Sequence, residues 1–190
     1  MRSLDRKLLV LDLDETLVHA SPQPLQRRAD FCLGLHHVYL RPHLSRFLTF
    51  ALTTFDVGIW TAAGEQYAAE VVKRIFDDDA PLRFVWSASQ CTLSRDRATG
   101  EYRTVKKLRK LEGQGYALET AIAIDDTPTT YARYYGNLVT VNEYRGAEDD
   151  HELLLLERFL EHISMVPNVR AVEKRRWRSE VNGVSAGGRP

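Results

Sequence analysis

The chain has 190 residues, of which 44% are hydrophobic, so it can bury the core of one domain. Lys and Arg number 26 in total, as do Asp and Glu. The zero net charge excludes an overall field that would draw the chain to nucleic acid, membranes or acidic polymers. Two cysteines, Cys32 and Cys91, are too few for a disulfide framework, and no apolar run reaches the length of a secretion signal or a membrane span. We therefore expect a cytoplasmic, unanchored protein, whose oligomeric state the composition leaves open.

Five short apolar runs, rich in β-branched or aromatic residues, predict strands that are covered on both faces. In chain order these runs are Lys7 to Leu13, Asp56 to Trp60, Arg83 to Ser87, Ala121 to Ile124 and Leu138 to Val141.

Helical periodicity appears between and after these strands. Apolar residues from Leu44 to Leu52 share one face, and those from Ala68 to Phe76 share another. A weaker helix is predicted from Val105 to Glu112, and a strong final one from Leu153 to Ile163. The alternation of strands and helices predicts an α/β fold, an open three-layer sandwich around a mostly parallel five-stranded sheet.

Two stretches break this alternation, Ser21 to Tyr39 and Ala88 to Arg103, and each predicts a small hairpin insert. Neither is long enough to form a large folded cap. The domain is expected to cover residues 1–166. Residues 167–190 hold Arg and Lys side chains around Trp177 and a Gly-rich end, and are expected to form a frayed helix and a basic, partly disordered tail rather than a docking arm.

Polar side chains follow three of the predicted strands at the point where each strand ends. Asp12 and Asp14 follow the first strand, Thr61 the second, and Asp125 and Asp126 the fourth. In open parallel sheets, ligands bind beyond the carboxyl ends of the strands, where the connections switch direction. With strands two and three on one side of the first and four and five on the other, the order is 3-2-1-4-5 and the switch point lies between the two aspartate pairs.

Clustered carboxylates repel one another and raise one another's pKa unless a cation is present, so the pattern predicts a hard divalent cation. Mg²⁺ prefers oxygen ligands and commonly also contacts a substrate phosphate. The expected metal ligands are Asp12, the main-chain carbonyl of Asp14, and Asp126. Asp125 is expected to bond to a metal-bound water or to a lysine.

A phosphate also needs hydrogen-bond donors and positive charge around its oxygens. Thr61 and a lysine can supply them. Lys106 and Lys107 precede the fourth strand, but neighbouring residues on a helix point about 100° apart, so only one of the two can face the site.

The four motifs of the haloacid dehalogenase (HAD) superfamily of phosphohydrolases resemble an ordered set in this chain: Asp12-Leu13-Asp14-Glu15-Thr16, Trp60-Thr61-Ala62, Lys106 and Asp125-Asp126. Within that superfamily, the chain is most similar to the RNA polymerase II C-terminal-domain phosphatases and their small, NLI-interacting-factor-like relatives. The further segments that carry this similarity are Leu11 to His19, Arg41-Pro42, Val105 to Leu108 and Asp125 to Pro128. The resemblance extends from about Lys7 to Ile163.

The resemblance implies a Rossmann-like HAD fold and a role for each matching residue. Asp12 would be the nucleophile that carries the phosphoryl group as an aspartyl-phosphate. Asp14 would protonate the leaving oxygen and then deprotonate the hydrolytic water. Thr61 and Ala62 would bind the phosphate, and Lys106 would bridge the phosphate and the nucleophile. These roles describe a Mg²⁺-dependent phosphomonoester hydrolase.

The expected substrate is phosphoserine, phosphothreonine or phosphotyrosine in a protein or peptide, because a site without a folded cap is open to large molecules. One alternative is a phosphatase of small molecules or nucleic-acid ends, although the zero net charge makes nucleic acid an unlikely partner. Another is a module that accepts a phosphoryl group on Asp12 without turnover, against which Asp14 and Thr61 argue. The small phosphatases commonly carry Asn where Asp126 stands, which can alter metal affinity.

Overall fold

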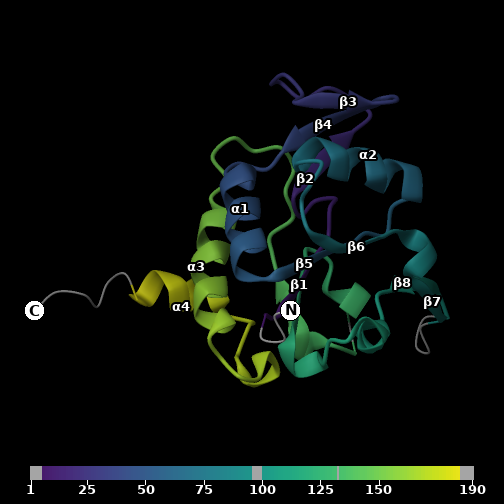
Figure 1. The fold of residues 1–190 in the computed structure, drawn as a ribbon. Coiled ribbons are helices and arrows are strands. Elements are labelled where there is room, and N and C mark those ends of the chain that lie inside the picture. Colours follow the sequence, from purple (N-terminus) through teal and green to yellow (C-terminus); the bar gives the residue numbers. More distant parts are fainter. Residues whose placement is uncertain (1–5, 96–99, 132, 185–190) are drawn as a thin grey trace, which may run out of the picture.

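The structure is a computed structural model that describes residues 6–95, 100–131 and 133–184. A five-stranded sheet of order β10-β9-β1-β5-β6 forms its centre, and every pairing within it is parallel. Numbered by their appearance along the chain, the five strands have the predicted order 3-2-1-4-5, which is confirmed, and the switch point lies between β1 and β9. β1 and β5 lie side by side at the centre of the domain (Figure 1). The strands are β1 (Leu8–Leu11), β5 (Asp56–Trp60), β6 (Leu82–Trp86), β9 (Ala121–Asp125) and β10 (Leu138–Thr140).

Helices and short 3₁₀ segments cover the two faces of this sheet, which gives the three predicted layers. The α-helices are α1 (Leu44–Thr54), α2 (Glu65–Ile75), α3 (Glu152–Ser164) and α4 (Trp177–Val184). The 3₁₀ helices used below are η2 (Leu108–Gln114), η4 (Pro128–Tyr131), η5 (Tyr135–Asn137) and η6 (Val169–Ala171).

Alternate residues of β1 enter two separate cores because successive side chains of a strand point to opposite faces. Leu9 and Leu11 join the core formed with α1, α2 and α3. Leu8 and Val10 join the core on the other face, which η2 and η4 cover. All four side chains are fully buried, as the continuous apolar run predicts for a central strand.

The predicted helix from Val105 to Glu112 is wrong in its start and its type. Val105 is the last residue of strand β8 (Tyr102–Val105), where it pairs with Thr92, and the 3₁₀ helix η2 begins only at Leu108. Non-local strand pairing overrides the local helical pattern here. Lys106 therefore lies in the connection between β8 and η2 and not on a helix.

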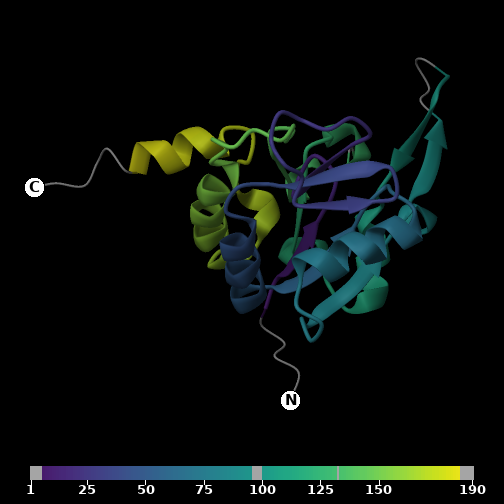
Figure 2. The ribbon, with the colours of Figure 1, turned by 90° about the horizontal axis from the view of Figure 1, so that it is seen from above.

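Both predicted inserts are present, and neither is a large cap. The first is a three-stranded antiparallel sheet of order β2-β4-β3 and not a simple hairpin, because β4 lies in the middle and pairs with both β2 and β3. The second is the hairpin β7–β8, which projects from the body of the domain (Figure 2); its turn, residues 96–99, lies outside the described residues. The remaining strands are β2 (Val18–Ser21), β3 (Phe31–Leu33), β4 (His36–Leu40) and β7 (Thr92–Arg95).

The described part of the C-terminal segment, residues 167–184, packs on the domain and contains the helix α4, where the sequence predicts a frayed helix and a basic tail. Val169 and Trp177 are buried in the main core. The Trp177 ring lies 5.6 Å from that of Phe159, and its Nε1 donates to the Thr140 carbonyl at 2.9 Å. Basic neighbours concealed this apolar anchor in the sequence. Residues 185–190, the Gly-rich end, lie outside the described residues.

Within the described ranges, no helix combines the length and the apolar character that crossing a membrane requires.

Candidate active site

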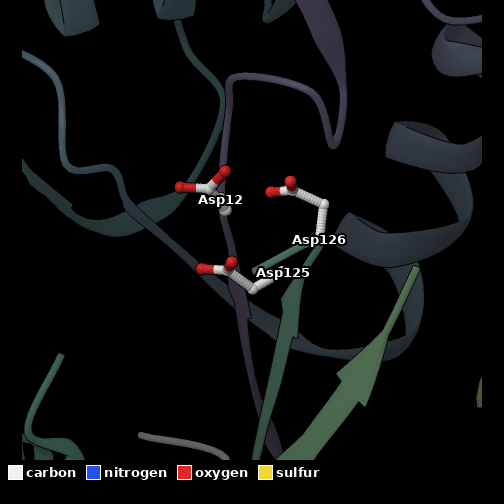
Figure 3. A group of neighbouring side chains, drawn as sticks. All are labelled: Asp12, Asp125 and Asp126. Carbon is white, nitrogen blue, oxygen red and sulfur yellow. The ribbon is translucent and has the colours of Figure 1, made fainter. Parts of the chain in front are cut away.

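Three aspartates meet beyond the carboxyl ends of the neighbouring strands β1 and β9. Leu11 pairs with Ile124, and the Asp12 N–H donates to the Ile124 carbonyl at 3.1 Å, which sets Asp12 beside Asp125. Asp12, Asp125 and Asp126 each offer a carboxylate oxygen, and these three oxygens lie within 4.8 Å of one another (Figure 3). The strand order thus brings together carboxylates that are more than 110 residues apart in the sequence.

Lys106 connects two of these aspartates. Its Nζ donates to Oδ1 of Asp12 and to Oδ2 of Asp125, both at 2.6 Å. The side chain is almost completely buried, whereas Lys107 is exposed, so Lys106 is the lysine that faces the site. Its backbone N–H donates to the Thr130 carbonyl at 2.9 Å, which fixes the connection against η4.

Burial and mutual repulsion shift the protonation equilibria of this cluster. Burial raises the pKa of the Asp12 carboxyl although Lys106 opposes the change, and the charge of Asp125 raises it further. Burial alone would lower the pKa of Lys106, but the two carboxylates that it bridges raise it above its usual value. Burial and Asp125 also raise the pKa of Asp126. Three carboxylates and one ammonium leave two uncompensated negative charges, which a divalent cation would balance.

The donor set fits a small hard cation. The three carboxylate oxygens are close enough to share one ion, and oxygen is the ligand atom that Mg²⁺ prefers. Both carboxylate oxygens of Asp125 accept hydrogen bonds, from the Thr127 N–H and from Lys106 Nζ, whereas Asp12 accepts from Lys106 through Oδ1. Asp12, through Oδ2, and Asp126 are therefore the proposed side-chain ligands of the ion. The Asp14 carboxylate is not part of this group; the expectation that its main-chain carbonyl binds metal stays a prediction.

Asp14 is held by the β5–α2 region. Its Oδ1 accepts a hydrogen bond from the Tyr67 hydroxyl at 2.5 Å, and its Oδ2 accepts one from Thr61 Oγ1 at 3.4 Å. Thr61 Oγ1 in turn accepts from the Ala63 N–H at 3.0 Å. Thr61 and Asp14 therefore meet at the same edge of the sheet, as predicted. Ala62 is exposed beside Thr61, and its role in phosphate binding stays a prediction.

Two side chains of the site are absent from the sequence prediction. Tyr67, in the first turn of α2, is the hydrogen-bond donor to Asp14, and burial together with the Asp14 charge raises its pKa, so it is a proton-bearing donor at neutral pH. Thr127 donates its N–H to Asp125 at 2.8 Å and its hydroxyl to Asp126 at 3.1 Å. The N–H contact is the Asx-type bond to the residue two further on, a local signal that could have been found. The position of Tyr67 depends on how α2 packs.

The Arg41 side chain of the Arg41-Pro42 segment contacts the turn that follows Asp14 and two more distant segments. The fully buried Arg41 guanidinium makes a bidentate pair with Asp150 at 3.0 and 2.8 Å. It also donates to the carbonyls of Thr16 and Asn142, each at 2.9 Å. Arg41 therefore ties the turn that follows Asp14 to the loop before α3.

A parallel sheet of this order, with aspartates beyond β1 and β9 and a lysine between them, defines the class of the fold and site: the HAD superfamily that the sequence resembles. The chain belongs to the NLI interacting factor-like phosphatase family, whose family model matches residues 7–170. This confirms the resemblance stated from the motifs.

Two relatives and one solved structure describe its neighbourhood. The chain is 33% identical over 179 residues to the human carboxy-terminal domain RNA polymerase II polypeptide A small phosphatase 1, covering 88% of this chain and 63% of the relative. It is 31% identical over 183 residues to phosphatase Herzog of Drosophila melanogaster, covering 90% of this chain and 48% of the relative. The structure of Fcp1, an essential RNA polymerase II CTD phosphatase, matches with a TM-score of 0.66 at 19% identity, over 98% of this chain and 67% of the other, and supports the fold. The chain thus spans 48–63% of the length of these two relatives.

Proposed function

We propose that the chain is a Mg²⁺-dependent phosphomonoester hydrolase that acts on phosphorylated proteins or peptides through an aspartyl-phosphate on Asp12. One observation carries the proposal: Lys106 bridges Asp12 and Asp125 while Asp14 is held separately, by Thr61 and Tyr67, at the same sheet edge. A nucleophile and an acid with different partners are what a two-step phosphoryl transfer needs. The family, and the names of the relatives as phosphatases, support the reaction class.

In the first step, Asp12 attacks phosphorus and the bond between phosphorus and the leaving oxygen breaks. Asp14 gives its proton to that oxygen, so the alcohol leaves uncharged. Lys106 holds the attacking carboxylate in place and offsets the charge of the phosphoryl oxygens. Thr61 is placed to donate to one of these oxygens. When bound, Mg²⁺ would supply Lewis-acid charge neutralisation, which lets an anionic carboxylate approach an anionic ester.

In the second step, water attacks the phosphorus of the aspartyl-phosphate. Asp14, now a carboxylate, takes the proton from this water. The bond between phosphorus and the Asp12 oxygen breaks, which releases inorganic phosphate and regenerates the Asp12 carboxylate. Tyr67 keeps Asp14 oriented in both steps through the 2.5 Å hydrogen bond.

A phosphorylated protein segment is the proposed substrate class because the two inserts are small sheets and no large cap lies over the site in the described residues. The name of the human relative refers to a part of a protein, the carboxy-terminal domain of RNA polymerase II polypeptide A.

Turnover of p-nitrophenyl phosphate with and without Mg²⁺, beside Asp12→Asn, tests the reaction. Loss of turnover in the chelated sample and in the variant supports the proposal, and undiminished turnover in either contradicts it. A panel of phosphopeptides, sugar phosphates and a 3′-phosphorylated oligonucleotide then tests the substrate class. A higher kcat/KM on a sugar phosphate or the oligonucleotide than on every phosphopeptide would contradict the protein-phosphatase proposal.

A cytoplasmic location is the remaining part of the proposal. It is supported by the free thiols of Cys32, which is exposed, and Cys91, since a reducing compartment preserves such thiols. Imaging of a fluorescent fusion of the full-length protein tests it, and a signal confined to the nucleus or to a secretory compartment would contradict it.

A further inference from the structure

A pocket of about 860 Å³ lies along β10, the edge strand of the central sheet that pairs with β9. Its walls come from β10, η5, the loop after β9 and the C-terminal segment. Pro128 in its wall is two residues beyond Asp126, and Thr140, also in its wall, pairs with Asp125. The pocket therefore begins beside the proposed active site, yet no step of the proposed reaction uses it.

The lining of this pocket is strongly cationic. Four basic side chains line it against one acidic side chain: Arg170, Lys174, Arg175 and Arg178 against Glu173. The chain as a whole has no net charge, so positive potential is concentrated at this place.

Two of the four cations already have carboxylate partners. The Nε of Arg178 donates to both carboxylate oxygens of Glu152, at 2.9 and 3.0 Å. The Nε of Arg175 donates to Glu173 at 3.3 Å. These pairs account for the acidic groups that the structure places against the basic segment.

Lys174 and Arg170 remain without a carboxylate partner among the described residues. Lys174 is only 6% exposed, and its Nζ donates to the carbonyls of Val169 and Val172, which leaves one of its three N–H groups for another acceptor. Burial, opposed by the charge of Glu173 and assisted by that of Arg170, lowers the pKa of Lys174 to about 8. The exposed Arg170 guanidinium makes no hydrogen bond or ion pair within the described ranges.

The cationic wall is held in place by the core. Val169 and Trp177, on either side of Lys174, are both buried, and the Trp177 ring packs on α3. A wall fixed in this way loses little conformational freedom when a ligand binds, which favours recognition.

We propose that this pocket binds a second anionic group of the phosphorylated peptide, a phosphate or a carboxylate, through Arg170 and Lys174; this inference rests on the proposed function. The volume exceeds what one phosphate ion fills, and the lining reaches Pro128, two residues beyond Asp126, so a segment of chain fits better than a free ion. The pocket lies along β10, which is two strands away from β1, the strand that Asp12 follows. Neighbouring strands lie roughly 4.8 Å apart and one extended residue spans roughly 3.5 Å, so two strand spacings correspond to roughly three residues. The second group would then stand about two to four residues from the phosphate that is hydrolysed.

Sets of three phosphopeptides that differ only at a second position test the proposal, and every peptide has a single hydrolysable phosphoserine. The second position carries a non-hydrolysable phosphonate, a glutamate or a glutamine, and it is placed two, three or four residues to either side. We expect a KM about tenfold lower for an anionic peptide than for the glutamine peptide at the best spacing, as one charge-assisted contact provides. The advantage should decline as salt is raised, because it is electrostatic.

Variants locate the effect. Arg170→Gln and Lys174→Met should each remove most of the anionic advantage, whereas Arg158→Gln, which removes an equal charge from the exposed face of α3, should keep it. The KM values are compared with the turnover of p-nitrophenyl phosphate by the same variant. This substrate is too small to occupy the active site and the pocket together. Equal KM for all three peptides at every spacing, with p-nitrophenyl phosphate turned over normally, overturns this inference alone. Absence of p-nitrophenyl phosphate turnover in the unaltered protein would instead overturn the proposed function.

Discussion

At the scale of single residues, the site divides into two groups of partners. Lys106 holds Asp12 and Asp125 in a buried group, and Tyr67 with Thr61 holds Asp14 apart from it. Each carboxylate therefore has its own hydrogen-bond partners, which hold the proposed nucleophile and the proposed acid in separate positions.

Tyr67→Phe should lower kcat about tenfold on phosphoserine peptides with little change in KM, because one hydrogen bond to a charged group is lost. The reduction should be smaller on p-nitrophenyl phosphate, whose leaving oxygen needs little protonation. Steady-state kinetics on both substrates check this, with Tyr102→Phe on the exposed face of β8 as control. An equal reduction on both substrates would argue against a role for Tyr67 in positioning the acid.

Asp126→Asn should raise the Mg²⁺ concentration for half-maximal activity about tenfold, because the charge of the ligand set sets its affinity. At saturating Mg²⁺ the activity should stay within about a factor of two, since an amide still offers an oxygen. Calorimetric titration with Mg²⁺ checks the affinity independently of turnover. Unchanged binding would remove Asp126 from the proposed metal ligands.

The sequence was informative at this scale where function depends on neighbours along the chain. Asp12 and Asp125 could be predicted at the edge of the sheet because each stands at the end of an apolar run. The strand order, with β1 beside β9, then brings the two side chains together. The choice between Lys106 and Lys107 needed the structure, since it depends on where β8 ends. Tyr67 had no local signal, because its partner is 53 residues away.

At the scale of elements, the strands and the helices α1, α2 and α3 follow from apolar periodicity, whereas the C-terminal segment does not. Its apolar anchors, Val169 and Trp177, are separated by charged residues, so composition suggested a solvated tail. Trp177 is buried because its ring packs on α3, and nothing in the local sequence indicates that contact. Long-range packing thus decided what local pattern could not.

Trp177→Ala should lower the free energy of unfolding by about 3–5 kcal/mol, as for other large buried aromatic residues. Met165→Ala is the matched control, since Met165 is 84% exposed, and it should change the stability by less than about 0.5 kcal/mol. Urea unfolding followed by fluorescence and circular dichroism measures both. A Trp177→Ala protein as stable as the unaltered one would restore the prediction of a loose tail.

At the scale of the whole molecule, the buried Arg41 joins three regions that are distant in the sequence: the turn after Asp14, the loop after β10 and the approach to α3. Burial alone would raise the pKa of Asp150, but its hydrogen bonds to Arg41 lower it below the usual value. A carboxyl with a lowered pKa in the folded state stabilises that state above its unfolded pKa of about 3.9, and the contribution is lost as the pH falls through the folded value.

Asp150→Asn should therefore lower the free energy of unfolding at pH 7. It should also weaken the decline of that free energy between about pH 5 and about pH 2, the range in which a carboxyl takes up its proton. The loss at pH 7 should be about 2 kcal/mol, below the value for a fully buried pair, because the Asp150 side chain is 16% exposed. Glu157→Gln, which breaks the exposed Arg46 pair, is the control. Parallel pH profiles for Asp150→Asn and the unaltered protein would contradict this assignment.

The central claim is that Asp12 carries the phosphoryl group during turnover. Asp14→Asn should slow hydrolysis of the intermediate, so rapid acid quenching of this variant during its reaction with p-nitrophenyl phosphate, whose leaving oxygen needs little protonation, should trap it. Mass spectrometry of the digested protein then locates the modification. The account predicts the mass of one phosphoryl group on the peptide that contains Asp12, and none after Asp12→Asn. A phosphoryl group on any other residue, or turnover with no modified peptide at any quench time, would contradict it.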